Sequence, residues 1–395
     1  MRLPLLIVTI LFFAGIATDT YIYYALKRYR LGKIPFIVHY SVSAICAMLL
    51  ISIMFMPVRT GSDTILRAVM WMLYTYLSVY TSKLIFVLFD ALSLVPVKFG
   101  KKQYRPLSIA GAVLGCLWFI AMWWGALFNR FNINVEKVDV KIEGLPPAFD
   151  GFTIAQISDL HVGTYGSDTA FMSKLVDEIN GLHPDMIVFT GDIVNRKANE
   201  LTPFSTVLSR LKAPYGVYAI LGNHDYGDYV DWPEEQMKKD NLDSLLSQIK
   251  SMGWKMLNNS HELVGIGNDT IAIVGVENVG DPPFHTYGDL AKAYPTPSDK
   301  RTKILLSHNP AHWHNDISGN KTNNYALTLS GHTHAMQMEF LSISPATFRY
   351  EEWGGLYSDG SGHHLYVNIG TGTVGIPARI GATPEVTLIT LRHQH

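Results

Sequence analysis

Eight polar side chains that could hold metal ions or move protons recur where short apolar segments end. They are Asp159, His161, Asp192, Asn223, His224, His308, His332 and His334. Carboxylate, amide and imidazole groups, with no thiolate among them, suit borderline divalent metals such as manganese, iron or zinc. Eight groups exceed what one ion holds. They suit two ions about 3.5–4 Å apart that share a bridging carboxylate.

The individual pieces of this pattern differ in how specific they are. Asp159-Leu160-His161 and Gly191-Asp192 also occur in ordinary turns. Gly331-His332-Thr333-His334 is more specific, because an apolar core would not tolerate two imidazoles around a tight turn unless they had partners. The order of the pieces and their strand-end positions make the whole set specific.

The elements that must position these groups begin near Ile133, where the sequence pattern changes. Strands are predicted at Asn134–Ile142, Gly151–Ser158, Met186–Thr190, Val217–Leu221, Ile271–Val276, Lys303–Ser307, Ala326–Ser330 and Leu365–Ile369. Helical spacing occupies Ser167–Asn180 and Pro203–Leu211. The alternation predicts a βαβ arrangement, in which sites form at the carboxyl ends of the strands. Two segments rich in Pro, Asp, Gly and aromatics, Asp228–Asp240 and Asp281–Lys300, are predicted to be loops near the site entrance.

The first third of the chain has the composition of membrane-spanning segments. Hydrophobic residues make up 48% of the chain and charged residues only 16%. Four apolar segments are long enough to span a bilayer: 3–26, 34–56, 65–89 and 107–128. Asp19, Arg67 and Lys83 interrupt them, and we interpret these charges as snorkelling or paired within the bundle rather than functional. Segment 3–26 could instead be a secretory signal peptide, because Arg2 precedes an apolar stretch and a Gly15-Ile16-Ala17 sequence.

Positive charge in the short loops predicts an orientation. Lys27, Arg28, Arg30 and Lys33 follow the first segment, and Lys98, Lys101, Lys102 and Arg105 follow the third. The loop between the second and third segments holds only Arg59 and Arg67. The positive-inside rule places the two basic loops in the cytoplasm. Everything after Phe128 is then expected outside it, on a plasma or inner membrane protein.

The length of 395 residues fits about two units. We expect four transmembrane helices over 1–128, a linker with the first strand over 129–150, and a catalytic domain over 151–395. The net charge of −1 gives no field that would attract nucleic acid. Cys46 and Cys116 lie inside apolar runs, so neither suggests a disulfide framework or a zinc site. The oligomeric state has no signature in the sequence.

The motif order resembles that of the calcineurin-like metallophosphoesterases over about residues 133–395. The shared order is Asp-x-His, Gly-Asp, Gly-Asn-His-Asp, His and Gly-His-x-His. The resemblance implies a layered αββα sandwich behind the transmembrane region, in the α/β and α+β class. It implies that Asp159, His161, Asp192 and His334 hold one metal. Asn223, His308 and His332 then hold the second, and Asp192 bridges. His224 would be the catalytic histidine, with Asp225 orienting it.

Two further stretches narrow the resemblance to one branch. Pro184–Asp192 and the tail from Tyr366 to Leu388 look like the transmembrane proteins with a metallophosphoesterase domain and an alternative type of UDP-2,3-diacylglucosamine pyrophosphatase. Related sequences often read Gly-Gly-Gln after the last metal histidine, where this chain has Ala335-Met336-Gln337. Larger side chains there are expected to reshape the pocket. Arg379, in the loop before Pro384, is a candidate for contacting a phosphate.

The expected activity is metal-dependent hydrolysis of a phosphodiester or pyrophosphate. Two cations, manganese being expected and iron or zinc the alternatives, lower the pKa of a bridging water to give hydroxide near neutral pH. His224 then assists the leaving oxygen, which is worth roughly 10²–10⁴ in rate. The membrane anchor favours a lipid-linked substrate. Hydrolysis of soluble phosphoesters by a tethered domain, and an inactive membrane scaffold, are the alternatives; the complete donor set argues against the scaffold.

The predicted orientation conflicts with one reaction of the branch. The diacylglucosamine pyrophosphatase reaction uses a cytoplasmic nucleotide-sugar, whereas the basic loops place the catalytic domain outside the cytoplasm. An extracytoplasmic lipid phosphate fits the charge pattern. A cytoplasmic nucleotide-linked lipid fits the branch, and the sequence leaves both open.

Overall fold

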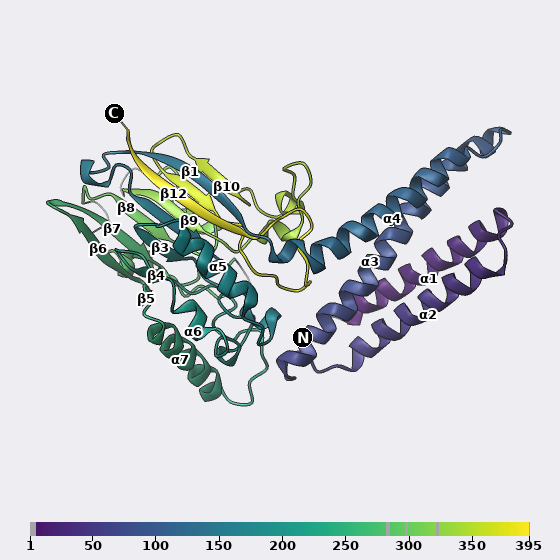
Figure 1. Cartoon of the computed structure of the whole chain (residues 1–395), viewed down its shortest axis with the longest axis horizontal. Coiled ribbons are helices and arrows are strands. Elements are labelled where there is room, and N and C mark those ends of the chain that lie inside the picture. Colours follow the sequence, from purple (N-terminus) through teal and green to yellow (C-terminus); the bar gives the residue numbers. More distant parts are fainter. Residues whose placement is uncertain (1–4, 282–284, 297–298, 321–323, 395) are drawn as a thin grey trace. The chain divides into compact units, whose positions relative to one another are not determined.

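The computed structural model describes residues 5–281, 285–296, 299–320 and 324–394. The chain forms two compact units (Figure 1). Unit 1 consists of Met1–Leu127 with Gly375–Ala378, and unit 2 of Phe128–Val374 with Arg379–His395. Part of the predicted loop Asp281–Lys300 lies outside the described residues.

Unit 1 contains the four predicted helices. They are α1 (Leu5–Arg28), α2 (Lys33–Phe55), α3 (Asp63–Ser93) and α4 (Arg105–Leu127). Among the described residues, three helices are long and apolar enough to cross a membrane: α1, α2 and the helix beginning at Arg105. The 31-residue α3 carries more charge, including Arg67, Lys83 and Asp90.

The buried charges of unit 1 have partners, which confirms the interpretation of Lys83 and Asp19 as paired. Lys83 Nζ lies 2.8 Å from Asp19 Oδ1, and the Tyr80 hydroxyl donates to Asp19 Oδ2 at 2.8 Å. Asp90, which is fully buried, forms an ion pair with Arg28 and accepts a hydrogen bond from Tyr21. The Arg28–Asp90 pair joins the end of α1 to the end of α3. It therefore places the two basic loops at the same end of the helical unit, as the charge pattern requires.

Unit 2 contains two six-stranded mixed sheets. The first has the order β1 (Asn134–Glu143), β12 (Glu385–Gln394), β2 (Thr153–Ile157), β3 (Met186–Phe189), β4 (Val217–Ala219), β5 (Lys255–Met256). The second has the order β10 (Gly355–Ser358), β11 (His364–Val367), β9 (Tyr325–Ser330), β8 (Lys303–Leu306), β7 (Asp269–Gly275), β6 (Ser260–Ile266). Strands β2 to β5 run parallel, as do β7, β8, β9 and β11. The strand ends that carry polar groups therefore meet along one edge of each sheet.

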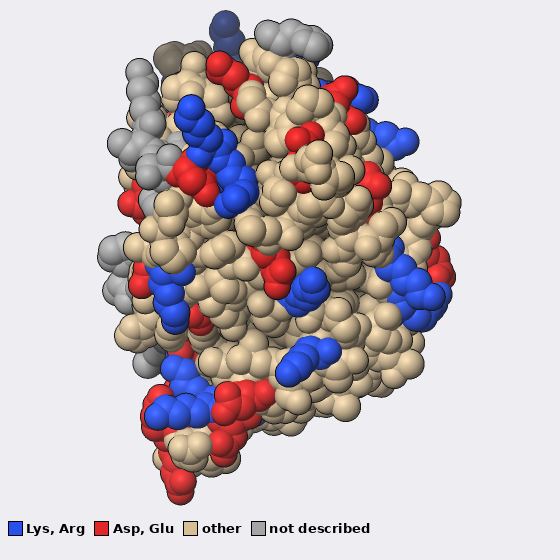
Figure 2. All heavy atoms as spheres, turned by 90° about the vertical axis from the view of Figure 1, so that its left-hand side faces the viewer, with Lys and Arg blue, Asp and Glu red and all other residues tan. Residues whose placement is uncertain are grey.

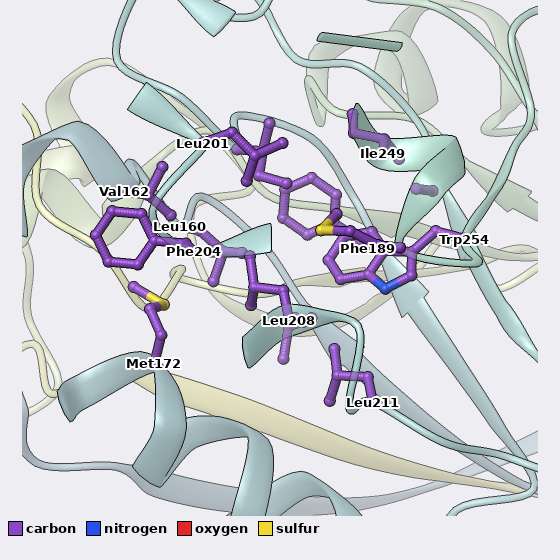
Figure 3. Packing of buried hydrophobic residues seen from close by; sticks show 14 of the residues in the cluster. Leu160, Val162, Met172, Phe189, Leu201, Phe204, Leu208, Leu211, Ile249 and Trp254 are labelled. Atoms are coloured by element: carbon purple, nitrogen blue, oxygen red, sulfur yellow. The ribbon is translucent and has the colours of Figure 1, made fainter. Parts of the chain in front are cut away.

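Alternating side chains build the layers of unit 2. In β2, Ile154 packs between the two sheets, while Ala155 and Ile157 pack against the helical layer. That layer comprises α5 (Ala170–Gly181), α6 (Ser205–Leu208) and α7 (Glu235–Ser251). Figure 3 shows Met172, Leu208 and Ile249 of these helices in one apolar cluster with Phe189 and Trp254. On the outer face of the second sheet, Trp313 and Ile317 cover Val274. The result is the predicted αββα sandwich.

The predicted elements differ from the structure mainly in length. Pro203–Leu211 contains only the single turn of α6. The prediction of a loop over Asp228–Asp240 is wrong in its second half, because α7 begins at Glu235. The sequence of α7 is mostly polar, and only Leu245 and Ile249 of this helix are buried, so the apolar spacing that would predict a helix is weak.

The surface of unit 2 carries both signs of charge. Figure 2 shows Lys and Arg side chains interspersed with Asp and Glu over the face in view. On that face, within the part of the chain that the structure describes, no broad area of one sign is present. This distribution agrees with the net charge of −1 and differs from the basic surfaces that follow nucleic acid backbones.

Candidate metal centre

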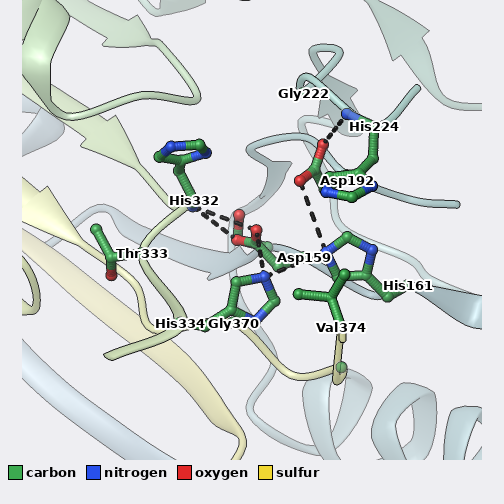
Figure 4. Close-up of polar contacts among 12 residues, drawn as sticks. Asp159, His161, Asp192, Gly222, His224, His332, Thr333, His334, Gly370 and Val374 are labelled. Atoms are coloured by element: carbon green, nitrogen blue, oxygen red, sulfur yellow. Dashed lines mark hydrogen bonds and ion pairs between the residues drawn. The ribbon is translucent and has the colours of Figure 1, made fainter. Parts of the chain in front are cut away.

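All seven predicted metal donors lie at strand ends of unit 2, and both sheets contribute. Asp159 and His161 follow β2, Asp192 follows β3, and Asn223 follows β4 in the first sheet. His308 follows β8, and His332 and His334 follow β9 in the second. The structure brings the seven together. Figure 4 shows Asp159, His161, Asp192, His332 and His334.

The first group of donors gathers around His334. Its Nε2 lies 3.1 Å from Asp159 Oδ1 and 3.1 Å from His161 Nε2. His161 Nε2 lies in turn 3.6 Å from Asp192 Oδ2. Four donor atoms from three chain segments and both sheets therefore face one point.

The second group gathers around His308. Its Nε2 lies 3.2 Å from Asn223 Oδ1, 3.3 Å from His332 Nδ1 and 3.3 Å from Asp192 Oδ2. Asp192 Oδ2 thus faces both groups. Its other oxygen, Oδ1, accepts the backbone N–H of His224 at 2.8 Å, which fixes the carboxylate. This arrangement is what a bridging ligand requires.

The spacing of the donors fits two cations. Donors bound at about 2.1 Å to one ion, in octahedral or tetrahedral geometry, lie about 3.0–3.4 Å from one another. The seven donors lie 2.9–3.6 Å from their neighbours. A pair of facing imidazole nitrogens such as His161 and His334 Nε2, buried without a cation, would need a proton between them. Mixed oxygen and nitrogen donors at this spacing match a dinuclear centre.

Backbone carbonyls orient two of the imidazoles. His161 Nδ1 lies 3.2 Å from the Val194 carbonyl, and His308 Nδ1 lies 2.7 Å from the Thr190 carbonyl. A carbonyl oxygen only accepts, so each Nδ1 carries a hydrogen and each Nε2 is the nitrogen left to bind a metal. Both Nε2 atoms face the donor groups, as in metal-bound histidines.

Electrostatics keep the site ready for cations. Burial lowers the pKa of His332 to about 3, and nearby positive charge on His308 adds to this effect. Burial also holds the pKa of His161 well below its ordinary value. The pKa of Asp192 is likewise low, because His308 and His224 outweigh the effect of burial. His161, His332 and Asp192 therefore offer lone pairs and negative charge at neutral pH without losing a proton first. His308 differs, because Asp192 and Asp159 outweigh burial and raise its pKa to about 9, so a bound cation must displace a proton from it.

His224 lies beside the donors with one nitrogen fixed. Its Nδ1 lies 2.6 Å from the Asn195 carbonyl, so Nδ1 carries the hydrogen and Nε2 remains to exchange a proton. The Tyr229 ring stacks on the imidazole with centroids 4.2 Å apart. The ring of His161 meets it edge-on at 4.8 Å. Sequence reasoning missed Asn195 and Tyr229, because neither a main-chain acceptor nor a stacking ring leaves a motif.

The expected role of Asp225 in orienting His224 is wrong. Its carboxylate accepts four backbone N–H groups, those of Asp192, Ile193, Val194 and Gly222, at 2.9–3.2 Å. It is fully buried, and burial first and Asp192 second raise its pKa to about 7. Asp225 therefore shapes the turn that presents Asp192, while the Asn195 carbonyl orients His224.

Arg379 also differs from its expected role. Its side chain is fully buried and donates to the carbonyls of Gly372, Ile369 and Ala382. Its Nη2 lies 3.3 Å from His334 Nδ1. The expectation that Arg379 contacts a phosphate is therefore wrong. The side chain instead stabilises the loop segments next to His334 through these hydrogen bonds.

Strained backbone is concentrated at this site. Asp159, His161, Asp192, His332 and His334 all have positive φ, between 42° and 73°. Ala335 and Met336 continue the left-handed run at 50° and 48°. Glycine takes this conformation without cost, whereas other residues do not. The positions at which related sequences often carry glycine are thus positions where this chain bears backbone strain.

Comparison with known families supports both units. Residues 152–336 match the family model described as calcineurin-like phosphoesterase. Residues 1–130 match the model described as probable calcineurin-like phosphoesterase, transmembrane domain, which includes all four helices. Together with the three apolar helices, this second match identifies a membrane protein.

Individual relatives agree with the family models. The chain is 30% identical over 272 residues to an uncharacterized metallophosphoesterase, YkuE, of Bacillus subtilis, covering 66% of this chain and 86% of that protein. It is 31% identical over 268 residues to a transmembrane protein with metallophosphoesterase domain of Danio rerio, covering 66% of this chain and 57% of that protein. It is 30% identical over 252 residues to the UDP-2,3-diacylglucosamine pyrophosphatase LpxG of Chlamydia muridarum, covering 53% of this chain and 72% of that protein.

Proposed function

The chain belongs to the calcineurin-like metallophosphoesterases, a family of dinuclear metal-dependent hydrolases of phosphoester bonds, and from that premise we propose that it hydrolyses a lipid-linked phosphodiester or pyrophosphate at a membrane surface. One observation carries the proposal: Asp192 Oδ2 lies 3.6 Å from His161 Nε2 and 3.3 Å from His308 Nε2. A single carboxylate oxygen then serves two metal positions, which is the geometry of a two-metal hydrolase.

Each metal position has its own donors. Asp159, His161 and His334 would hold the first ion, and Asn223, His308 and His332 the second, with Asp192 shared. Manganese is the proposed metal, with iron or zinc as alternatives, because the donors are carboxylate, amide and imidazole without thiolate. When bound, the pair supplies an activated water and neutralises charge on the phosphoryl group.

The protein's own residues do the remaining work. Asp225 fixes the turn that carries Asp192 and so holds the backbone that presents the shared carboxylate. The Nδ1–H of His224 is committed to the Asn195 carbonyl, so its Nε2 can deliver a proton to the leaving oxygen. The Tyr229 hydroxyl accepts a hydrogen bond from Asn223 Nδ2 at 2.8 Å, which turns Asn223 Oδ1 toward the second metal position.

The lipid-linked substrate is proposed from the membrane anchor. The spanning helices hold the catalytic unit at a bilayer, where substrates fixed in the same bilayer are concentrated. The basic loops favour an extracytoplasmic catalytic domain and hence a lipid phosphate on that side. A pyrophosphatase reaction like that in the name of the Chlamydia relative is the cytoplasmic alternative. A reporter fused after the C-terminus separates the two orientations.

The first experiment tests hydrolysis itself. Full-length protein in detergent, supplied with Mn²⁺, should hydrolyse bis(p-nitrophenyl) phosphate, and Asp192→Asn should lose nearly all of this turnover. Metal content measured by mass spectrometry should fall in the same variant. A wild-type protein that binds no transition metal, or an Asp192→Asn variant with intact turnover, would contradict the proposal.

The second experiment addresses the substrate. Lipid pyrophosphates in mixed micelles and soluble nucleotides are offered to the same preparation. We expect a higher kcat/KM for the lipid substrates. Preference for nucleotides would replace the lipid-linked substrate with a soluble one and leave the hydrolase assignment intact.

A further inference from the structure

A cluster of exposed apolar side chains follows the last candidate metal ligand. Phe340, Leu341, Ile343 and Phe348 are 75%, 80%, 68% and 94% exposed. We call these four residues the apolar tip. Four large apolar side chains within nine residues of unit 2 are costly to leave in water. Such a patch marks a surface that another apolar phase covers.

The apolar tip lies on a segment whose two ends are fixed at the metal centre. The segment begins at His334, and its far end returns to the site at Tyr350, whose hydroxyl lies 3.4 Å from His332 Nε2. In between, the Ser344 hydroxyl donates to the Ala335 carbonyl at 2.6 Å. The apolar tip therefore belongs to a loop that starts and ends at the catalytic site.

The backbone of the tip is a tight two-residue turn. Phe340 and Ile343 exchange backbone hydrogen bonds, at 2.9 and 3.0 Å, around Leu341 and Ser342. Both central residues have positive φ, 50° and 61°. Turns of this kind favour Asn-Gly, and a bulky leucine is unfavourable there. A strained leucine at an exposed tip indicates that its side chain has a use outside the fold.

Hydrogen bonds within unit 2 connect this segment to the end of the membrane anchor. Asn129, two residues beyond α4, donates from Nδ2 to the Arg379 carbonyl at 3.0 Å. The next residue, Ile380, pairs with the tip segment: its N–H donates to Gln337, and its carbonyl accepts from Glu339, both at 2.8 Å. Phe340 follows Glu339 directly. One intervening segment thus separates the tip from Asn129.

We infer that the apolar tip inserts into the membrane interface near Asn129 and sets the entrance of the metal centre at the level of the lipid headgroups. The phase that covers the tip is the bilayer, because the membrane anchor precedes Asn129 and hydrogen-bonded segments connect Asn129 to the residue before Phe340. Aromatic and aliphatic side chains of this kind bury into the headgroup and acyl boundary. The inference deepens the proposed function and rests on it: the substrate class is a lipid whose phosphoester lies in the headgroup layer.

The test measures depth directly. A bimane fluorophore is attached at Leu341→Cys in full-length protein that also carries Cys46→Ser and Cys116→Ser, in phosphatidylcholine vesicles. Lipids bearing a nitroxide high on the acyl chain should quench it, and aqueous iodide should not. Leu263→Cys on β6, an exposed apolar position at the other end of the second sheet, is the matched control and should respond to iodide alone.

Both alternative outcomes overturn the inference. Quenching of position 341 by iodide, as at 263, means that the tip lies in water. Protection of position 341 from both quenchers means that protein, a second copy included, covers it. Each labelled variant must first retain turnover of bis(p-nitrophenyl) phosphate, so that unfolding is not mistaken for a change in the position of the tip.

A second variant connects the tip to the substrate. Replacing the four tip residues with serine should leave turnover of bis(p-nitrophenyl) phosphate within about twofold and reduce turnover of a vesicle-borne lipid pyrophosphate roughly tenfold or more. Equal turnover of the lipid substrate by both proteins would overturn the inference alone. Absence of turnover on either substrate in the wild type would instead remove the proposed function.

Discussion

The carboxylate of Asp225 accepts the backbone N–H of Asp192 at 2.9 Å, so the second acid of the Gly-Asn-His-Asp motif supports the bridging residue rather than the neighbouring histidine. Three more N–H groups, of Ile193, Val194 and Gly222, point at the same carboxylate. Gly222 is itself constrained, because a Cβ there would lie 2.2 Å from Asp192 Oδ1. The position of the bridging carboxylate and the conformation of the turns around it are therefore set by the same contacts.

Asp225→Asn should weaken metal binding and stability together. The amide would place N–H groups against N–H donors, leaving buried donors unpaired at a cost of about 1–3 kcal/mol each. Metal affinity should fall about 10–100-fold, as it does when groups that support ligands are removed. Thermal unfolding with and without Mn²⁺ and a metal titration measure both effects. Reduced turnover at unchanged metal affinity would instead restore a direct role beside His224.

His224→Ala should separate chemistry from metal binding. No metal donor is lost, so both ions should remain, while turnover falls by roughly 10²–10⁴ because the leaving oxygen loses its proton source. The loss should be smaller for p-nitrophenyl esters, whose leaving group needs little protonation, than for an alkyl ester. Equal losses on both esters would indicate that His224 acts by binding the substrate. Tyr229→Phe keeps the stacked ring but removes the hydroxyl that accepts from Asn223, so it should weaken metal binding and leave the difference between the two esters unchanged.

Met336→Gly and Met336→Val should change stability in opposite directions. Met336 has φ of 48° and is 43% exposed, so its side chain contributes little burial. Glycine removes a left-handed penalty of roughly 1–2 kcal/mol and adds nearly 1 kcal/mol of unfolded-state entropy, for a net gain of up to about 1 kcal/mol. A β-branched residue is disfavoured there and should lower the melting temperature. A glycine variant less stable than the valine variant would contradict this account of the turn.

Lys83→Met should destabilise the helical unit more than the double variant Lys83→Met with Asp19→Leu. The single change leaves Asp19 charged in an apolar bundle, at about 3–5 kcal/mol, whereas removing both charges leaves neither unpaired. Thermal unfolding of the four proteins of the cycle in detergent gives the coupling between the residues. Additive losses would mean that the 2.8 Å contact between Lys83 and Asp19 contributes nothing.

The sequence predicted the site better than it predicted its supports. Ligands such as Asp159 and His332 recur as motifs because chemistry dictates their type and their place at strand ends. Supports such as the Asn195 carbonyl leave no signature, because any residue supplies a carbonyl. The role of Asp225 was taken from the family resemblance, and it is mistaken because Asp225 accepts backbone N–H groups while His224 Nδ1 is bound to the Asn195 carbonyl. The polar helix α7 was missed for a related reason, since it buries too little to show a periodic pattern.

Glu385 should make the catalytic unit less stable as pH rises from about 5 to 8. Its carboxyl is buried, and burial raises its pKa from 4.5 to about 7 although Thr387 and Tyr366 donate to it. Between these two values the folded state holds a proton that the unfolded state has lost. Stability therefore falls with increasing pH, by on the order of 3 kcal/mol in total.

Glu385→Gln should keep the hydrogen-bond acceptor and remove this slope. The variant should then unfold at a higher temperature than the wild type at pH 8 and at a similar temperature at pH 4.5. Glu143→Gln, at an exposed position on β1, is the control and should leave the slope unchanged. Parallel pH curves for wild type and Glu385→Gln would show that this carboxyl is already ionised in the folded protein.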